Sequence, residues 1–491
     1  MSNLVSKKPK VALLESIRSI GYNFNSALAD IIDNSISANA KKVDIFLIES
    51  IPAIAICDDG CGMSFDELDI AMDLGSKSPE LDRDENDLGR FGLGMKSASF
   101  SQCKCLTVSS LKNNNISSMT WDLDVVQKEQ EWLLKINNED EINNLPYINY
   151  LKDMKHGTIV QWSNFDRIKI SNVDLKTTLL DNLLNASKYL ALVFHKYLSE
   201  KKIQIRINNN ELKTLDPFLM KKGTCQHLKT QPILMNSKKG EKHIIKVTPH
   251  ILPFYKDLSE EDYELLGGKD NIKNEQGFYI YRNKRLIIWG TWLHMVGKNE
   301  LYKNARVEVE IPNSLDDIWE VDVKKASASI PGTIREQLIA KVKEAIGGSK
   351  RIYKKRGEKL NAKKDVKTVW NVSEERDTYE FKINRKLPLI EELLSDLSED
   401  KKALLNALLS DIETNIPKMQ IYTTIAEAKD KKVEDDEKDL VLNNINEILN
   451  GMTNVSKIEL ISFLEMIFHS EPYCDYPEIL EDLKKELNEN E

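Results

Sequence analysis

The sequence predicts an α+β protein with three parts, and three observations support this prediction. The chain has 491 residues, which is too long for one hydrophobic core. Helical and strand-like patterns of apolar residues alternate up to about residue 345, as in α+β domains. The pattern then becomes mainly helical. We therefore expect domains at 1–212 and 213–345, followed by a basic connector and a helical region at 346–491.

The first part is predicted to begin with a helix that leads into a β-hairpin. Residues 11–38 have helical spacing of apolar side chains with a break near Gly21, and two short β-branched runs follow at 43–48 and 53–57. The other elements predicted for this part are strands at 105–110, 116–123, 157–162 and 203–207 and an amphipathic helix at about 174–200.

The second and third parts have different patterns. The elements predicted for the second part are strands at 242–249, 277–289 and 305–311 and a helix at about 332–346. In the third part, 393–409 and 440–449 are leucine-rich, which predicts helices.

The composition excludes several classes of protein. With 41% hydrophobic and 30% charged residues, the chain can bury real cores and is not disordered as a whole. It has neither a run of 18 apolar residues nor an N-terminal secretory signal, so we expect a cytosolic protein that does not enter a membrane. Its six cysteines and seven histidines lack the spacing of a metal site, and we expect reduced thiols.

The charge is unevenly distributed along the chain. The net charge is −9, yet residues 341–367 contain eleven basic and three acidic side chains. This stretch could contact the phosphates of DNA or serve as a solvated connector, and the sequence leaves both interpretations open.

A polar stripe follows one side of the helix predicted at 25–38. At 100° per residue, Asp30, Asn34 and Ser37 lie on one side with Asp33 beside them, while the apolar residues face away. Taken alone, such a stripe is typical of a solvated helix face.

Asp58 and two glycines come directly after an apolar strand. Gly60 and Gly62 permit positive φ and close backbone approach, and a carboxylate at a buried strand end can accept a hydrogen bond from a ligand amine. Taken alone, this segment is also typical of an ordinary turn.

A glycine-rich loop leads into a helix at residues 89–99. Free N–H groups at the helix N-terminus and a lysine suit phosphate oxygens. The loop is not a P-loop, because Met95 separates Gly94 from Lys96, and it is not a dinucleotide-binding fingerprint, because Ser97 replaces the last glycine.

The order of these motifs resembles that of the GHKL ATPases, the group of gyrase B, the ninety-kilodalton heat-shock chaperone, histidine kinases and MutL. Asp30-x-x-Asp33-Asn34 is followed by Asp58-x-Gly60-x-Gly62, then by three glycines at 89–94, and then by Gly157-Thr158 before an apolar strand. The run 89–99 with its lysine and the helix that ends in Ile32-Asp33-Asn34-Ser35 are most similar to MORC (microrchidia) proteins and their bacterial relatives. The resemblance covers about residues 1–345 and implies a Bergerat-type ATP-binding sandwich followed by a transducer-like domain.

The resemblance also implies roles for individual residues. Asn34 would bind Mg²⁺, Asp58 would accept a hydrogen bond from the adenine amino group, and Thr158 would support Asp58 through a water molecule. Residues 75–95 would form a lid over ATP. The further residues that it places at the nucleotide are Gly60, Gly62, Met63, Gly89, Gly92, Gly94 and Lys96.

Two candidate catalytic residues follow from the same resemblance. Most family members have a glutamate as general base four residues before the Mg²⁺ asparagine, whereas this chain has Asp30. Aspartate is one methylene shorter, so we predict slow hydrolysis. In the transducer-like domain Lys325, or otherwise Lys324, would contact the γ-phosphate.

The resemblance therefore predicts an ATP-dependent switch that closes as a homodimer. A clamp that acts on DNA through 341–367, in defence against foreign DNA, is the first hypothesis. A chaperone-like or scaffold ATPase is the second, with partner proteins bound at 385–470. A pseudo-ATPase that only binds nucleotide is the third.

Overall fold

A computed structural model describes residues 10–489 with short gaps. The residues inside this range that it does not describe are 20, 49, 75–93, 169–173, 238–239, 317, 320–330, 361–365, 376–377, 419, 422–433 and 453–455. The chain divides into two compact units, at 1–351 and 352–491, and each is considered by itself. Among the described helices, none combines the length and the apolar character needed to span a membrane.

The first unit contains an eight-stranded mixed sheet with the order β5-β4-β3-β6-β2-β1-β7-β8. Strand β1 pairs in parallel with β7, and the other neighbours are antiparallel. The strands are β1 (Lys42–Ile48), β2 (Ala53–Asp58), β3 (Cys105–Lys112), β4 (Asn115–Asp122), β5 (Leu134–Ile136), β6 (Gly157–Ser163), β7 (Gln204–Ile207) and β8 (Asn210–Glu211).

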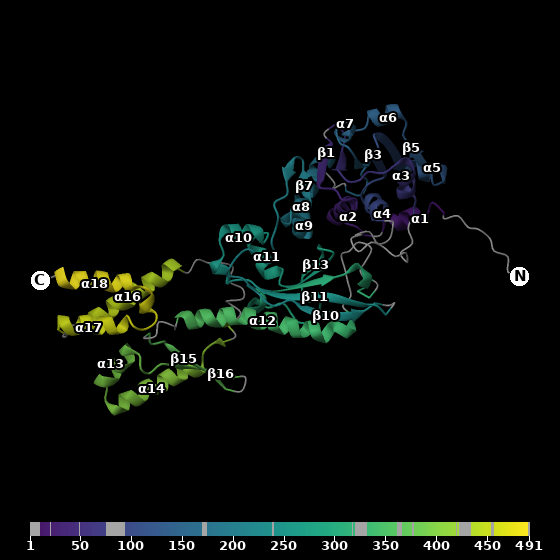
Figure 1. The fold of residues 1–491 in the computed structure, drawn as a ribbon. Helices are drawn as coiled ribbons and strands as arrows, with labels where there is room; N and C mark the ends of the chain where they lie inside the picture. Colours follow the sequence, from purple (N-terminus) through teal and green to yellow (C-terminus); the bar gives the residue numbers. More distant parts are fainter. Residues whose placement is uncertain are drawn as a thin grey trace. The chain divides into compact units, whose positions relative to one another are not determined.

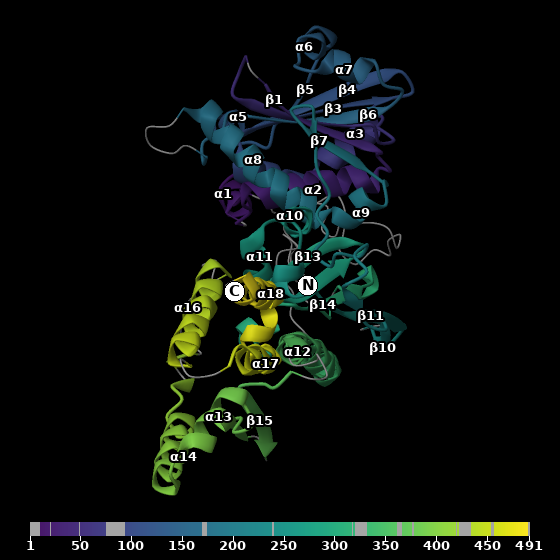
Figure 2. The same ribbon diagram turned by 90° about the vertical axis from the view of Figure 1, so that its left-hand side faces the viewer.

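Both faces of this sheet are covered by helices (Figure 2). Alternate residues of β1 belong to different cores: Ile45 packs with the helices on one face, and Phe46 packs with α7 on the other. The helices on the first face include α1 (Leu13–Arg18), α2 (Phe24–Ser37), α4 (Gly94–Gln102) and α8 (Leu175–Val193). The remaining helices of this part are α3 (Phe65–Met72), α5 (Leu123–Glu129), α6 (Glu139–Asn143), α7 (Ile148–Lys152) and α9 (His195–Ser199).

A second sheet follows within the same unit (Figure 1). Its order is β10-β11-β14-β12-β13, with β9 paired to β11. The strands are β9 (Gln226–His227), β10 (Gln231–Asn236), β11 (Lys242–Ile251), β12 (Gly277–Arg282), β13 (Arg285–Thr291) and β14 (Ala305–Ile311). The accompanying helices are η1 (Tyr255–Asp257), α10 (Glu260–Leu265), α11 (Lys269–Asn274), η2 (Glu300–Tyr302), η3 (Asn313–Leu315) and α12 (Gly332–Leu360).

Helix α12 is longer than the helix predicted at 332–346. Its first turns bury Ile334, Leu338 and Val342 against the second sheet. It then continues to Leu360 through the basic stretch, because lysine, arginine and glutamate are good helix formers.

The second unit is mainly helical, as predicted, but it also contains a hairpin that was not predicted. Strands β15 (Trp370–Glu375) and β16 (Thr378–Ile383) pair in antiparallel fashion. The helices are α13 (Pro388–Asp396), α14 (Glu399–Thr414), α16 (Glu434–Gly451), α17 (Lys457–Ile467), η4 (Tyr473–Asp475) and α18 (Pro477–Glu489). The predicted fold class, α+β with two mixed domains and a helical C-terminal region, is thus confirmed.

Candidate functional site

Helix α2 carries the first candidate residues, and its polar side is not the solvated face that the stripe alone would indicate. The helix begins after a capping box, in which the Asn23 side chain accepts from the Ser26 N–H at 2.8 Å. Asp30 and Asp33 are only 3% and 1% exposed, whereas Asn34 is exposed. The solvated-face interpretation is therefore wrong for both carboxylates, because other elements pack over that side of the helix.

Asp30 lies between Tyr22 and the start of α4. The Tyr22 hydroxyl donates to Oδ2 of Asp30 at 2.7 Å. Burial raises the pKa of Tyr22, and the negative charge of Asp30 raises it further, so this hydroxyl stays protonated and donates its hydrogen to Asp30. A Cβ placed on Gly94 would lie 3.8 Å from the same carboxylate oxygen. The structure thus brings Asp30 and Gly94 together.

Asp33 pairs with an arginine of the second sheet. Arg285, the first residue of β13, is 1% exposed, and its Nε lies 2.9 and 2.8 Å from the two carboxylate oxygens of Asp33. Arg285 lies within the strand predicted at 277–289 and was not among the predicted site residues. The sequence contains little indication of this ion pair, because the two partners are 252 positions apart in the chain.

Asp58 is buried at the end of β2, next to α2. Its Oδ1 accepts from the Gly60 N–H, and its Oδ2 accepts from the Ser35 hydroxyl, both at 2.9 Å. Burial raises the pKa of Asp58 to about 6, although hydrogen bonds from Gly60, Ser35 and the Thr158 backbone lower it. Ser35 was not among the predicted residues, and it joins Asp58 to the helix that carries Asn34.

The turn after Asp58 has a conformation that glycine favours. Gly62 has φ of 66°, and a Cβ at this position would overlap the carbonyl oxygen of Leu111. At Gly60, a Cβ would lie 2.8 Å from the Cβ of Ala38 in the residue after α2. The two glycines therefore allow the turn to approach both α2 and β3 closely.

Ser110 of β3 connects Met63 with Thr158, and sequence reasoning missed it. Its hydroxyl oxygen accepts from the Met63 N–H at 2.8 Å and lies 2.9 Å from Oγ1 of Thr158. Thr158 is in turn the β6 partner of Asp58 across the sheet. Asp58, Met63 and Thr158, which are far apart in the sequence, thus belong to one cluster.

Lys96 is buried in α4, only 2% exposed. Its amine donates to the carbonyl oxygen of Ala71 at 2.7 Å, and burial lowers its pKa to about 8. The amine is thus held beside α3. Four other predicted residues, Gly89, Gly92, Lys324 and Lys325, and most of the predicted lid at 75–95 lie outside the described residues.

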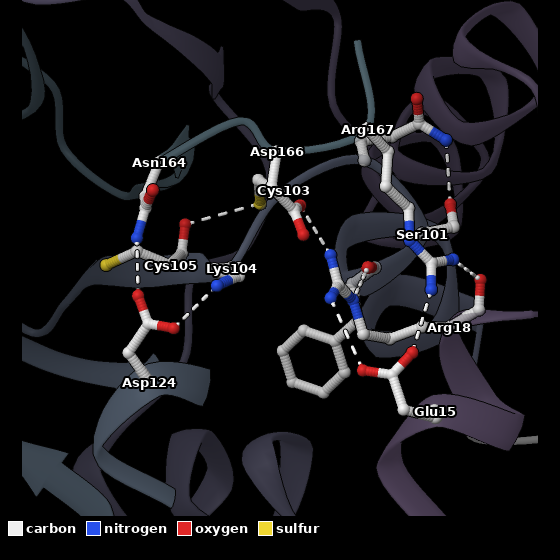
Figure 3. Close-up of polar contacts among 12 residues, drawn as sticks. Glu15, Arg18, Ser101, Cys103, Lys104, Cys105, Asp124, Asn164, Asp166 and Arg167 are labelled. Atoms are coloured by element: carbon white, nitrogen blue, oxygen red, sulfur yellow. Dashed lines mark hydrogen bonds and ion pairs between the residues drawn. The ribbon is translucent and has the colours of Figure 1, made fainter. Parts of the chain in front are cut away.

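A network of ion pairs holds α1 against the end of α4 (Figure 3). Arg18 donates to the Phe100 carbonyl oxygen at 2.9 Å and pairs with Asp166 at 2.5 Å, while Arg167 pairs with Glu15 at 3.0 Å. These contacts position the chain that leads from α1 to Tyr22, and hence to Asp30.

Comparison with known proteins identifies the region of the site. The family model described as histidine kinase-, DNA gyrase B-, and HSP90-like ATPase matches residues 22–158. This range begins at Tyr22, ends at Thr158 and includes every predicted site residue except Lys325 and its alternative Lys324.

Two curated relatives are similar over short segments. The DNA mismatch repair protein MutL of Rhizorhabdus wittichii is 43% identical over 49 residues, which is 10% of this chain and 8% of that protein. MutL of Paramagnetospirillum magneticum is 40% identical over 60 residues, which is 12% of this chain and 10% of that protein. The chain thus spans about a tenth of the length of these relatives.

Proposed function

We propose that the protein is a molecular switch that binds ATP with Mg²⁺ and hydrolyses it slowly, since residues 22–158 match the model of the histidine kinase-, DNA gyrase B-, and HSP90-like ATPases. The observation that carries this proposal is the position of α2 between two other motifs. Gly94 lies beside Asp30, and Asp58 accepts a hydrogen bond from Ser35, the neighbour of Asn34.

The buried carboxylate of Asp58 suits recognition of adenine. Gly60 and Ser35 donate hydrogen bonds to it and hold it in place, and it accepts a further hydrogen bond from the amino group of the base. Gly62 and Met63 line the adenine pocket, and Thr158 supports Asp58. Burial favours this arrangement because a hydrogen bond is stronger where water is excluded.

The triphosphate is held by the other residues of the site. Asn34 is exposed and offers its amide oxygen to Mg²⁺, which would neutralise charge on the phosphate oxygens. In this proposal the N–H groups of Gly89, Gly92 and Gly94 contact the phosphates. The amine of Lys96, which donates to the Ala71 carbonyl oxygen in this structure, would exchange that hydrogen bond for one to a phosphate oxygen. Lys325, or otherwise Lys324, contacts the γ-phosphate.

Asp30 acts as the general base for the attacking water. The Tyr22 hydroxyl donates to Oδ2 of Asp30 and so helps to orient the carboxylate that would take a proton from water. Because aspartate reaches less far than the glutamate usual in the family, turnover is slow.

ATP binding drives homodimerisation in this proposal, as in the MORC-like clamp, and DNA is the substrate on which the clamp acts in defence against foreign DNA. Two facts support DNA: the matched relatives are named as DNA mismatch repair proteins, and Lys343, Lys350 and Arg351 are exposed on α12. Lys341, in contrast, is buried and pairs with Glu344.

One observation favours the chaperone-like or scaffold alternative. Several leucines of the second unit are exposed, including Leu404 at 70%. An apolar surface of this kind is typical of protein association. Binding of a protein client that is insensitive to DNA would favour this alternative, and salt-dependent DNA binding that strengthens with an ATP analogue would favour the clamp.

The test is the mass of the protein in solution with and without a non-hydrolysable ATP analogue. We expect the wild type to dimerise with the analogue and the Asn34→Ala variant to stay monomeric. Asn185→Ala, which changes an exposed asparagine on α8, is the matched control and should dimerise like the wild type. The proposal would be contradicted if the mass of the wild type did not change when the analogue is added, or if the Asn34→Ala variant dimerised.

A further inference from the structure

Three side chains form a row across the first sheet at the candidate site. Asp58 of β2 is paired with Thr158 of β6, and Thr158 is paired with Ser110 of β3. Residues that are paired directly across neighbouring strands have their side chains on the same face of the sheet. The row therefore begins at the carboxylate that is proposed to bind adenine and ends at the Ser110 hydroxyl, which is fully buried.

The Ser110 hydroxyl has three polar neighbours, and their chemistry determines where its single hydrogen lies. Its oxygen accepts from the Met63 N–H at 2.8 Å. It also lies 3.0 Å from the Gly157 carbonyl oxygen and 2.9 Å from Oγ1 of Thr158. A carbonyl oxygen has no hydrogen to donate, so Ser110 must be the donor in its contact with Gly157. Ser110 then has no hydrogen left for Thr158.

The Thr158 hydroxyl is therefore the donor in its contact with Ser110. Once its hydrogen is used in this way, the Thr158 oxygen can only accept hydrogen bonds from other groups. The ionised carboxylate of Asp58 can also only accept. These two neighbours in the row, which the proposed function places at the adenine end of the site, thus offer acceptors and no hydroxyl hydrogen.

The Ser110 hydroxyl also acts on Asp58 through the backbone. It donates to the carbonyl oxygen of the peptide group that joins Gly157 to Thr158, and the N–H of that group donates to the Asp58 carboxylate. Hydrogen bonds in such a chain polarise and strengthen one another. Ser110 thus supports both acceptors of the row, one through the Thr158 hydroxyl and the other through the Thr158 backbone.

We propose that Ser110 is a positioning residue that makes the site select a 6-amino purine over a 6-oxo purine. This inference rests on the proposed function of Asp58 as acceptor for the adenine amino group. Adenine has an amino donor where hypoxanthine and guanine have a carbonyl oxygen. An oxygen that can only accept favours the amino group and repels the carbonyl group. Without Ser110, the Thr158 hydroxyl is free to turn and donate to that carbonyl oxygen.

The experiment measures the affinity of the full-length protein for ADP and for IDP, with Mg²⁺, by calorimetric titration. The two nucleotides carry adenine and hypoxanthine, so they differ only at this edge of the base. Burial raises the pKa of Asp58 to about 6, so a titration at about pH 8 keeps its carboxylate ionised.

The expected result is a change in selectivity. The wild type should bind ADP about 10- to 100-fold more tightly than IDP, and Ser110→Ala should reduce this ratio by about three- to tenfold. A merely structural role would weaken the binding of both nucleotides equally and leave the ratio unchanged.

Variants of Thr158 test whether Ser110 acts through this residue. Thr158→Ser keeps the hydroxyl and should keep the ratio, whereas Thr158→Val removes the hydroxyl and should lower the ratio. When Ser110→Ala is combined with Thr158→Val, the ratio should fall by clearly less than the product of the two single effects, because the hydroxyl on which Ser110 acts is already absent.

The matched control is Ser109→Ala, at the neighbouring position of β3. Ser109 is 3% exposed, and its hydroxyl lies 2.8 Å from that of Ser118. Its side chain lies on the opposite face of the sheet from Ser110, because successive residues of a strand alternate. Thermal unfolding of this variant should therefore occur at lower temperature, while the ratio of the two affinities stays that of the wild type.

Several outcomes would overturn the inference: an unchanged ratio in Ser110→Ala, fully independent effects at Ser110 and Thr158, or an equal fall of the ratio in Ser109→Ala. If Ser110→Ala does not fold, Ser110→Cys takes its place, because a thiol has a similar shape and is a weaker donor, and the ratio should again fall. A wild type that binds neither nucleotide, or binds both equally, would instead overturn the proposed function.

Discussion

The first unit, which contains the candidate site, and the C-terminal unit place their polar and apolar side chains in opposite ways. In the first, charged groups are buried at the candidate site: Asp30, Asp33, Asp58 and Lys96. In the second, the buried set of described residues is apolar apart from Ser470, and large apolar side chains face outward. Examples are Leu393, Leu404, Leu408, Leu440 and Ile458.

This difference indicates where each kind of function is to be sought. Burying an ionisable group costs free energy unless partners compensate for it, so four buried charges near one helix indicate a site whose chemistry needs them. Exposed leucines cost little and offer a surface for association. Changes in the first region should therefore alter catalysis or ligand affinity, and changes on the surface of the second should alter neither.

The largest expected effect comes from Asp30. In Asp30→Asn we expect kcat to fall by about 10²- to 10⁴-fold with little change in analogue affinity, because the amide cannot take a proton from water. Phosphate release under single-turnover conditions measures the effect and separates a slow enzyme from a pseudo-ATPase. Asp30→Glu adds one methylene, which lengthens the reach of the carboxylate, and should change turnover. Full activity in Asp30→Asn, or unchanged turnover in Asp30→Glu, would contradict the assignment.

A second large effect is expected at Asp58, on the affinity for nucleotide. Asp58→Asn should weaken affinity for an ATP analogue by about 10- to 100-fold, since a hydrogen bond to a charged group contributes about 1.5–3 kcal/mol. Calorimetric titration measures it. Asp59→Asn is the control, because Asp59 accepts from the N–H groups of Lys41 and Lys42 and does not bond to Asp58.

The pH dependence of binding follows from the same residue. Burial raises the pKa of Asp58 to about 6, so its carboxylate is ionised above that pH and protonated below it. Only the ionised form accepts freely from the adenine amino group, so wild-type affinity should fall as the pH decreases through about 6. Affinity that stays constant from pH 7 to pH 5 would argue against Asp58 as the acceptor.

A smaller effect, on stability, is expected at Gly62. An alanine there must adopt φ of 66° and avoid the Leu111 carbonyl oxygen, so we expect the free energy of unfolding to fall by about 1–3 kcal/mol. Thermal unfolding measures it. Gly223→Ala is the control, because a Cβ at Gly223 has no atom within 4 Å. Equal stability of the two variants would show that the turn rearranges easily.

Most of the fold could be predicted from the sequence, because the spacing at which apolar residues recur indicates which side of a helix or strand is buried. The helical period of α2 and the short β-branched runs of β1 and β2 were sufficient to predict these elements. The hairpin at 370–383 also has a period-two signal, in Tyr379, Phe381 and Ile383, but charged residues between them hide it. The local pattern of apolar residues thus predicts a helix or strand where most of its residues are apolar.

The candidate site was only partly predictable, and the missed residues share a physical reason. Ser35, Ser110 and Arg285 act as hydrogen-bond partners of predicted residues across the fold. Serine and arginine are common surface residues, and nothing local marks them as buried. Their roles depend on which strands and helices pack together in the fold. The spacing of residues along the chain does not indicate which elements will do so.

The smallest effect is expected on the exposed apolar surface of the second unit. Leu404→Ser and Leu408→Ser should change the free energy of unfolding by no more than about 0.5 kcal/mol, and ATP turnover should not change. Ile445→Ser, at a fully buried position of the same unit, is the control and should lower stability by about 2–5 kcal/mol. Chemical denaturation with parallel turnover assays measures both quantities. Lower turnover in the two leucine variants would mean that this surface affects the candidate site of the first unit. The division between the two regions would then be wrong.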